Sequence, residues 1–164
     1  MRLATAILTL SLLVSMSAFT GTAMAAEGDN NPQITIIRAD SLTSSKGPVT
    51  NFTGNVRLEP VFTANDSAPY SISHVTFEPG ARTAWHAHSA GQRLIITAGV
   101  GWVQQWGGPI VEVRAGDAVW FPPGVKHWHG ASPTESMTHI SLAGAIKGKS
   151  TEWMEKVSDE QYIK

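Results

Sequence analysis

Short apolar segments, separated by turns that contain Gly or Pro, follow one another from residue 71 to residue 143, and they restrict the fold more than any other feature. In several of them apolar and polar residues alternate, as in Ile110-Val-Glu-Val-Arg114, which is the period of a β-strand with one buried face. No stretch has the pattern of a long helix. The sequence therefore predicts an all-β fold, an antiparallel β-sandwich or barrel. Strands are expected over residues 34–38, 56–62, 71–77, 83–88, 92–98, 101–106, 110–114, 118–121, 126–131 and 137–143. One helical turn is expected at residues 158–161, which fit a capping box.

Two histidine-containing segments lie within this pattern. His86 and His88 are two residues apart, so on a strand they share a face and lie about 6.6 Å from each other along the chain. Gln92 follows a turn that would bring its amide oxygen beside them. His127 follows the turn signal Pro122-Pro-Gly124 and opens another strand. We therefore predict a metal site with His86, His88, Gln92 and His127 as ligands.

The ligand types limit the metal and its chemistry. The chain has no cysteine, which leaves nitrogen and oxygen ligands suited to manganese, iron, nickel, cobalt or zinc. Three neutral imidazoles and a neutral amide leave the full +2 charge of a divalent ion at the site, whereas a carboxylate ligand would reduce it. That charge favours bound anions, lowers the pKa of a bound water or alcohol, and favours Lewis-acid chemistry over redox cycling.

Both segments match the motifs Gly-x5-His-x-His-x3-Glu-x6-Gly and Gly-x5-Pro-x-Gly-x2-His in every spacing, with Gln92 in place of Glu. The chain thus resembles the cupin superfamily, and within it the small manganese-containing bacterial cupins with hydroxynitrile lyase activity, which share this Gln. The resemblance also covers residues 52–54, 76–85, 101–104, 127–131 and 153–155. It implies a single cupin domain of the jelly-roll kind, Mn²⁺ as the metal, and cleavage of a cyanohydrin such as mandelonitrile into an aldehyde and HCN, or the reverse addition.

Two further histidines are candidates for a catalytic base. His129 lies two residues after His127 and should face the same interior, while His139 lies on the expected strand 137–143. In the lyases that the chain resembles, the histidine matching His139 is the proposed base, and the residue matching Thr83 lines the pocket. The residues alone leave the choice between His129 and His139 open, and a structural core histidine is the alternative for His139. An apolar lining from Ser73, Val75, Phe77 and Trp85 would suit an aromatic aldehyde or nitrile.

The N-terminus predicts export. Arg2 precedes an apolar stretch, and Ala23-Met-Ala25 offers small residues for cleavage, so residues 1–25 are expected to be a signal peptide and residues 26–164 a cupin domain with its core motifs at 71–143. The protein would be secreted or periplasmic, with no membrane contact after cleavage. The formal net charge is −1 and no basic stripe is present, which argues against nucleic acid. The expected partners are a small-molecule substrate and, by the resemblance, further copies in a homodimer or larger homo-oligomer that exchanges residues 34–37.

Two other functions remain open at this point. A dioxygenase-type cupin acting on an aromatic or enol substrate would need iron or redox-active manganese, and Gln92 counts against it. A non-catalytic cupin could hold a small ligand on the metal or in the barrel mouth. The fold alone does not separate these functions from a lyase.

Overall fold

The computed structural model describes residues 33–163. Residues from Ile36 onward belong to one compact unit, and residues 33–35 belong to a second unit that begins at Met1. The predicted signal peptide, residues 1–25, lies outside the described residues. Within residues 33–163, none of the helices has the length and apolar composition needed to span a membrane.

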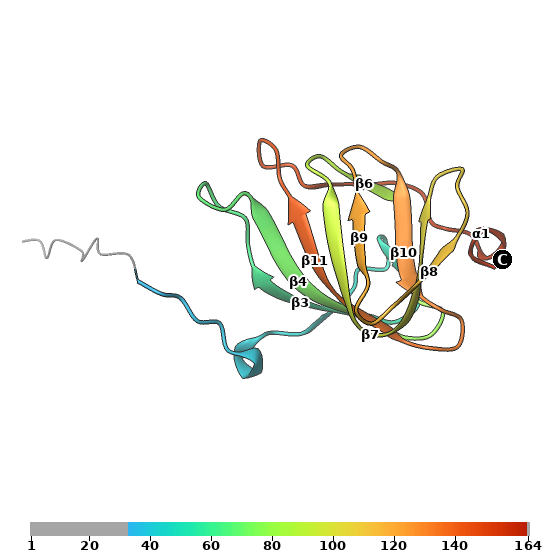
Figure 1. Ribbon diagram of the computed structural model, residues 1–164, viewed down its shortest axis with the longest axis horizontal. Coiled ribbons are helices and arrows are strands. Elements are labelled where there is room, and N and C mark those ends of the chain that lie inside the picture. The colour runs from blue at the N-terminus through green and yellow to red at the C-terminus, as the bar shows by residue number, and fades with distance from the viewer. Residues whose placement is uncertain (1–32, 164) are drawn as a thin grey trace, which may run out of the picture. The chain divides into compact units, whose positions relative to one another are not determined.

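Twelve strands in the described chain form one antiparallel sheet that curls into a barrel-like arrangement (Figure 1). They are β1 (Ser45–Lys46), β2 (Phe52–Thr53), β3 (Val56–Phe62), β4 (Tyr70–Phe77), β5 (Arg82–Thr83), β6 (His86–His88), β7 (Gln92–Gln105), β8 (Val111–Arg114), β9 (Ala118–Phe121), β10 (His127–Ala131), β11 (Met137–Gly144) and β12 (Thr151–Trp153). A 3₁₀ turn, η1 (Ala39–Ser41), and a short helix, α1 (Asp159–Tyr162), are added to them. The predicted all-β fold is confirmed.

The long strand β7 joins two halves of this sheet. Its first part pairs with β11 and β9, and its second part pairs with β10 and β8. We call the half made of β1, β3, β4, β11, the first part of β7 and β9 the first sheet, and the remaining strands the second sheet. Gly99 lies between the two parts with φ of +73°, and a Cβ there would be 1.8 Å from the Ser136 carbonyl oxygen. The sequence predicts two separate strands here because Gly99 resembles a strand end, whereas the chain continues through it.

The pleat of the first sheet directs one set of side chains into the barrel. Phe77, Leu94, Ile96 and Met137 are among the largest buried side chains of this interior. They come from three adjacent strands, β4, β7 and β11, so every second residue of each strand contributes to one continuous core. The histidines lie on the same inner side, so the polar site is built into the core.

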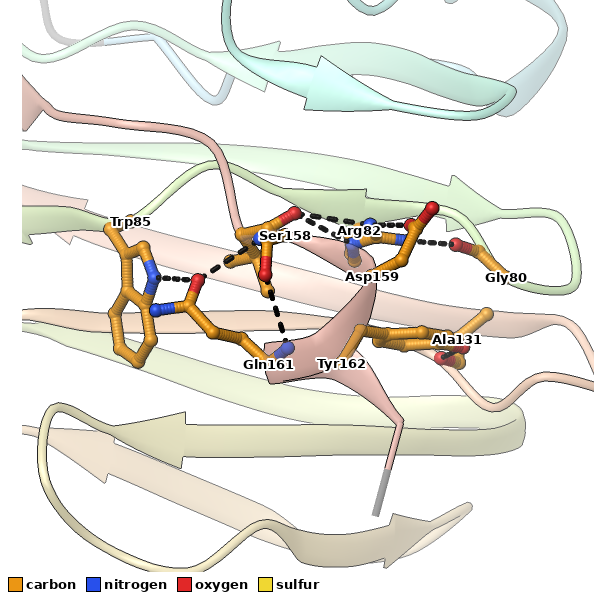
Figure 2. A network of polar contacts seen from close by, with 9 residues as sticks. Gly80, Arg82, Trp85, Ala131, Ser158, Asp159, Gln161 and Tyr162 are labelled. Carbon is orange, nitrogen blue, oxygen red and sulfur yellow. Dashed lines mark hydrogen bonds and ion pairs between the residues drawn. The ribbon is translucent and has the colours of Figure 1, made fainter.

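The C-terminal segment, residues 154–163, packs on the outer side of the second sheet (Figure 2). Val157 and Tyr162 form a second buried cluster with Trp85 and Trp128. The Arg82 guanidinium donates to the Val157 carbonyl oxygen at 3.0 Å and lies 4.5 Å from the centroid of the Tyr162 ring. This segment therefore completes a second layer against β5, β6 and β10.

Helix α1 begins at the predicted capping box. The Ser158 hydroxyl accepts a hydrogen bond from the Gln161 backbone N–H, and the Gln161 side chain accepts one from the Ser158 backbone N–H. The same Gln161 oxygen accepts a hydrogen bond from Trp85 Nε1 at 3.2 Å, and the Tyr162 hydroxyl donates to the Ala131 carbonyl oxygen at 2.9 Å (Figure 2). The cap thus also fixes the helix to the sheet.

Three expectations differ from the structure. The predicted strand 83–88 is split into β5 and β6, because the backbone N–H of Trp85 bonds to Glu155 instead of a neighbouring strand. Trp85 consequently lies in the outer cluster and does not line the interior, so its predicted place in the pocket is wrong. Residues 34–38 form no strand within this chain, and β1, β2 and β12 were too short to give a pattern.

Candidate metal centre and active site

Three histidines converge from two neighbouring strands. His86 and His88 are the first and last residues of β6. His127 is the first residue of β10, where it pairs with His86. The ring centroids are 4.2 Å apart for His86 and His127, 5.1 Å for His86 and His88, and 5.7 Å for His88 and His127. All three side chains are buried. The structure therefore brings the predicted ligand histidines around one point.

Each of these rings has its Nδ1 engaged by the chain. His86 Nδ1 donates to the Ala84 carbonyl oxygen at 3.0 Å, and His127 Nδ1 donates to the Val125 carbonyl oxygen at 2.8 Å. In both cases the carbonyl belongs to the residue two positions earlier, so the same local backbone geometry recurs at both ligands. Because a carbonyl only accepts, the hydrogen is on Nδ1 and the lone pair is on Nε2. His88 Nδ1 lies 3.2 Å from the Thr151 hydroxyl, and its Nε2 has no partner in the described residues.

Gln92 reaches the same point from the start of β7. Its Nε2 donates to Ser141 Oγ at 2.9 Å, which directs Oε1 toward His127 Nε2, 3.0 Å away. A neutral His127 with its hydrogen on Nδ1 presents a lone pair there, so two acceptors face each other. A metal ion would remove this repulsion, and three imidazole nitrogens with an amide oxygen form a donor set for a divalent first-row metal. The residues present therefore fit a metal ion.

Burial keeps these imidazoles neutral. It lowers the pKa of His88 and of His127 to about 4. It also lowers the pKa of His86 well below its ordinary value, and the neighbouring His127 lowers that pKa further. Metal ligation requires the deprotonated ring, so at neutral pH no proton competes with an ion for these nitrogens.

His129 offers an alternative third ligand from β10. One nitrogen of each of His86, His127 and His129 lies within 4.8 Å of the other two, so these three residues could also hold a metal ion. The ring of His88 is nevertheless nearer to both others, at 5.1 and 5.7 Å compared with 5.3 and 6.1 Å for His129. His88 also has its Nδ1 engaged, whereas neither ring nitrogen of His129 has a partner in the described chain. The ring centroids thus favour His88, whereas the ligand nitrogens within 4.8 Å of one another are those of His86, His127 and His129. The ligand set with His88 stays a prediction.

His139 lies beside His129 on β11, with the ring centroids 5.0 Å apart. Both rings are buried, and the centroid of each lies 5.7 Å from the centroid of the Phe77 ring. Burial lowers the pKa of His139 to about 3, and it lowers the pKa of His129 well below its ordinary value, where the charge of His139 adds to the effect. Neither nitrogen of His139 has a partner among residues 33–163. A neutral imidazole with a free lone pair can accept a proton, so both histidines can serve as a base.

A cavity of about 150 Å³ contains these side chains. Thr83 lines it, and its hydroxyl oxygen accepts a hydrogen bond from the His129 backbone N–H at 3.2 Å. Trp153 also lines it while remaining 38% exposed, which places this ring at the mouth. The indole lies 4.8 Å from the His86 ring and 5.6 Å from the Phe52 ring. The cavity is thus polar around the ligands and aromatic at its entrance.

Sequence reasoning missed three residues of this site. Ser141 orients Gln92, Thr151 contacts His88, and Trp153 covers His86. Thr151 pairs with His88 and Trp153 pairs with His86 in β12. Their two-residue spacing, which puts both side chains on one face of a strand, was the one sequence signal that could have placed them at the site. Of the predicted pocket residues, Val75 lines the cavity, whereas Ser73 does not and its neighbour Ser71 takes that place.

Comparison with known proteins gives two matches in sequence. The family model described as Cupin domain matches residues 73–142. A relative from Granulicella tundricola, named (R)-mandelonitrile lyase, is 56% identical over 127 residues, which amount to 77% of this chain and 97% of the relative. The match therefore extends over most of the described chain and not only the histidine motifs.

Solved structures show the same fold. A cupin-like protein from Thermotoga maritima is similar with a TM-score of 0.69 and 42% identity, covering 72% of this chain and 90% of that chain. The polyketide cyclase RemF from Streptomyces resistomycificus is similar with a TM-score of 0.63, covering 79% of this chain and 91% of that chain. Its 14% identity supports the fold alone.

Proposed function

The chain belongs to the cupin family, and on that premise we propose that it is a metal-dependent hydroxynitrile lyase. It cleaves a cyanohydrin such as mandelonitrile into an aldehyde and hydrogen cyanide, or catalyses the reverse addition. The 56% identity to (R)-mandelonitrile lyase over nearly the whole length of that relative carries this conclusion. The buried cluster of neutral histidines at a small cavity also supports it, because such rings can bind a metal ion or accept a proton.

The ligands would be Nε2 of His86, His88 and His127 together with Oε1 of Gln92. An ion held by these residues would supply positive charge that favours cyanide and a polarised substrate oxygen. Because every ligand is neutral, the chain does not reduce that charge, and Ser141 helps by keeping the oxygen of Gln92, not its nitrogen, directed at the cluster. We propose Mn²⁺ as the resident ion, because the chain shares Gln92 with the manganese-containing cupin lyases that it resembles.

His139 is the proposed base. In the cleavage direction a neutral ring nitrogen of His139 accepts the proton of the cyanohydrin hydroxyl. The electrons of that O–H bond form the carbonyl bond, and the bond between the carbinol carbon and the nitrile carbon breaks with its electrons on cyanide. His139 then returns the proton to cyanide, so hydrogen cyanide leaves and the imidazole is neutral again. The cycle needs no oxidant, reductant or second substrate.

Thr83 and His129 position the substrate oxygen in this proposal. The Thr83 oxygen already accepts a hydrogen bond from the His129 backbone, which leaves the hydroxyl hydrogen free to donate. Thr83 lines the cavity with His139, so this hydrogen can be directed at the hydroxyl or carbonyl oxygen of the substrate. His129 occupies the space between the ligands and His139, with ring contacts to both.

The cavity limits the size of the substrate. An apolar cavity of about 150 Å³ in another protein holds one benzene ring, and the volume found here is also about 150 Å³. Phe52, Val75 and Trp153 supply apolar surface at this cavity, so a single aryl group next to the reacting carbon fits, while the mouth at Trp153 sets the limit for larger groups. We therefore infer a cyanohydrin with one aromatic ring or a short aliphatic chain.

Export and assembly are further parts of the proposal. The arrangement of Arg2, the apolar stretch after it and Ala23-Met-Ala25 supports cleavage after residue 25 and a secreted or periplasmic mature protein. A homo-oligomer agrees with residues 33–38, which form no strand within this chain.

The test is a mandelonitrile cleavage assay combined with metal analysis of the purified protein. We expect the wild type to contain close to one divalent ion per chain and to release benzaldehyde. His127→Ala should lose both ion and activity because it removes a ligand. His74→Ala is the matched control, since His74 lies on the outer side of β4 opposite Glu59, and it should behave as the wild type.

Two outcomes would overturn the lyase function. A metal-loaded wild type that is inactive on mandelonitrile and on short aliphatic cyanohydrins contradicts it. So does a His127→Ala variant that is as active as the wild type. Oxygen consumption with phenolic or enolic substrates would instead identify a dioxygenase, and retention of a small ligand without turnover would identify a binding protein.

A further inference from the structure

Two of the side-chain hydroxyls that line the cavity are buried, those of Thr83 and Ser141. Each accepts one hydrogen bond from the chain. Thr83 Oγ1 accepts from the His129 backbone N–H at 3.2 Å, and Ser141 Oγ accepts from Gln92 Nε2 at 2.9 Å. Neither hydroxyl donates a hydrogen bond to any of residues 33–163. Each therefore brings one unused hydrogen to the cavity.

The hydrogen of Ser141 has no acceptor in the site. Gln92 uses only the oxygen of this hydroxyl, and the oxygen of the substrate is assigned to Thr83. A buried donor that lacks an acceptor costs free energy, so such a group in a folded protein needs an explanation. A ligand in the cavity that offers an acceptor to Ser141 would remove this cost.

The other hydroxyls at the cavity differ from that of Ser141. Ser71 Oγ donates to the Ala143 carbonyl oxygen at 3.4 Å, so its hydrogen is already used. Ser150 and Thr151 are half-buried, and water can satisfy their hydroxyls. Ser141 therefore joins Thr83 as a buried donor with an unused hydrogen at the cavity.

Ser141 lies close to the proposed base. It follows His139 by two residues on β11, so both side chains are on the inner face and about 6.6 Å apart along the strand. A cyanohydrin carries its hydroxyl and its nitrile on the same carbon, and the linear nitrile directs its nitrogen, an acceptor, away from that carbon. With the hydroxyl at His139, the nitrile can lie along β11 with its nitrogen at Ser141.

We propose that Ser141 binds the nitrile end of the substrate. Its hydroxyl donates to the nitrile nitrogen of the cyanohydrin and to cyanide after the bond between the two carbons has broken. This inference rests on the proposed lyase function and adds a substrate-binding residue to it. A hydrogen bond to the cyanide anion is charge-assisted and therefore stronger than one to the neutral nitrile. Ser141 thus favours the charge that develops during cleavage.

Ser141 is then also a residue that determines stereospecificity. The hydroxyl of the substrate is held by His139 and Thr83, and the nitrile is held by Ser141. The aryl group occupies the aromatic mouth of the cavity at Trp153. Three groups on one carbon with three separate binding positions select one enantiomer. Without Ser141 the nitrile loses its own position, and the selection weakens.

The test uses two aromatic ligands that each keep one end of the substrate. Phenylacetonitrile has the nitrile without the hydroxyl, and benzyl alcohol has the hydroxyl without the nitrile. Neither is cleaved, so calorimetry on the metal-saturated protein measures their binding without turnover. In Ser141→Ala we expect the dissociation constant of phenylacetonitrile to rise roughly 3- to 10-fold, the usual effect of one hydrogen bond, and that of benzyl alcohol to stay unchanged.

Two further variants serve as controls. Ser141→Thr keeps the hydroxyl and should bind phenylacetonitrile within about 2-fold of the wild type, since the lost hydrogen bond is restored. Ser71→Ala removes a hydroxyl from the same cavity whose hydrogen is already used, and it should not distinguish between the two ligands. In the synthesis of mandelonitrile from benzaldehyde and cyanide, the enantiomeric excess should fall in Ser141→Ala and not in Ser141→Thr.

Metal content separates the proposed role of Ser141 from its contact with Gln92. If Ser141 only orients Gln92, Ser141→Ala binds the ion more weakly but binds both ligands like the wild type once the metal is saturating, and the inference is overturned. Equal weakening of both ligands overturns it too, because the whole cavity has then changed. An unchanged enantiomeric excess contradicts the stereospecific role. These results leave the lyase function intact, which fails instead if a wild type with selective, Ser141-dependent nitrile binding does not cleave cyanohydrins.

Discussion

The five buried histidines of the interior form two groups that differ in how their rings are held. His86, His88 and His127 each have Nδ1 engaged by a carbonyl or hydroxyl of the chain. His129 and His139 have no hydrogen-bond partner on either nitrogen within residues 33–163. All five are almost completely buried, so burial does not separate the groups.

The difference indicates that the two groups have different functions. A carbonyl at Nδ1 fixes the tautomer, and any partner at Nδ1 fixes the ring direction. A metal ligand requires both because the ion needs the Nε2 lone pair at a set position. An unengaged ring is costly to bury, since its donor and acceptor both lack partners. That cost is removed when a bound molecule supplies the missing partners, as a substrate hydroxyl and its proton would do at His139. The first group is therefore arranged for an ion and the second for a substrate.

Replacing one histidine of each group by Ala should give the largest difference in metal content between two variants. In His88→Ala we expect the ion to be lost and the cleavage rate to fall to the uncatalysed level, because three ligands remain and the cavity gains room for water. In His129→Ala we expect the ion to be retained at close to one per chain. Metal content by inductively coupled plasma mass spectrometry gives the answer directly. If His129→Ala loses the ion and His88→Ala keeps it, the alternative set with His129 is correct.

The ligand group was predictable because its determinants are local in sequence. The two-residue spacing of His86 and His88 fixes their common face, and the turn before His127 starts a new strand. The carbonyls that bond to His86 and His127 are each two residues earlier, so they follow from the same local geometry. The strands β3, β4 and β11 of the first sheet were predictable for the same reason, since the alternation of each lies within seven or eight consecutive residues.

Long-range contacts account for what the sequence did not predict. Ser141 is 49 residues from Gln92, and Thr151 is 63 residues from His88, so no spacing rule connects them. Trp85 was expected to line the pocket, but the backbone between β5 and β6 bonds to residues 154 and 155, and the Trp85 side chain lies in the outer cluster. The outer position of Trp85 depends on the C-terminal segment, which local patterns do not include.

Removal of the proposed base should affect catalysis without affecting the ion. In His139→Gln we expect kcat to fall by roughly 10²- to 10⁴-fold, the usual contribution of a general base, with the metal content unchanged. Because burial holds the pKa of His139 at about 3, the base stays neutral across the ordinary range, and the wild-type kcat/KM should show no decline near the usual histidine pKa of about 6.5. A His139→Gln variant with wild-type kcat would show that His129 is the base.

Removing the hydroxyl of Thr151 tests the smallest difference between the two groups of histidines. Among the partners of Nδ1 in His86, His88 and His127, it is the one that belongs to a side chain and can be removed by substitution. Thr151→Val keeps the shape of the residue and removes the contact with His88, leaving a ligand ring as unengaged as those of His129 and His139. Loss of such a partner of a metal ligand costs about 10- to 100-fold in affinity, so we expect the dissociation constant of the ion to rise by that factor, measured by competition with a chelating dye. At saturating metal the kcat should recover, because Thr151→Val does not alter the base.

Thr53→Val on β2 is the control for the loss of a partly buried threonine hydroxyl elsewhere. An unchanged dissociation constant in Thr151→Val would mean that engagement of Nδ1 does not prepare His88 for an ion, and the distinction between the two groups would then lie in position alone.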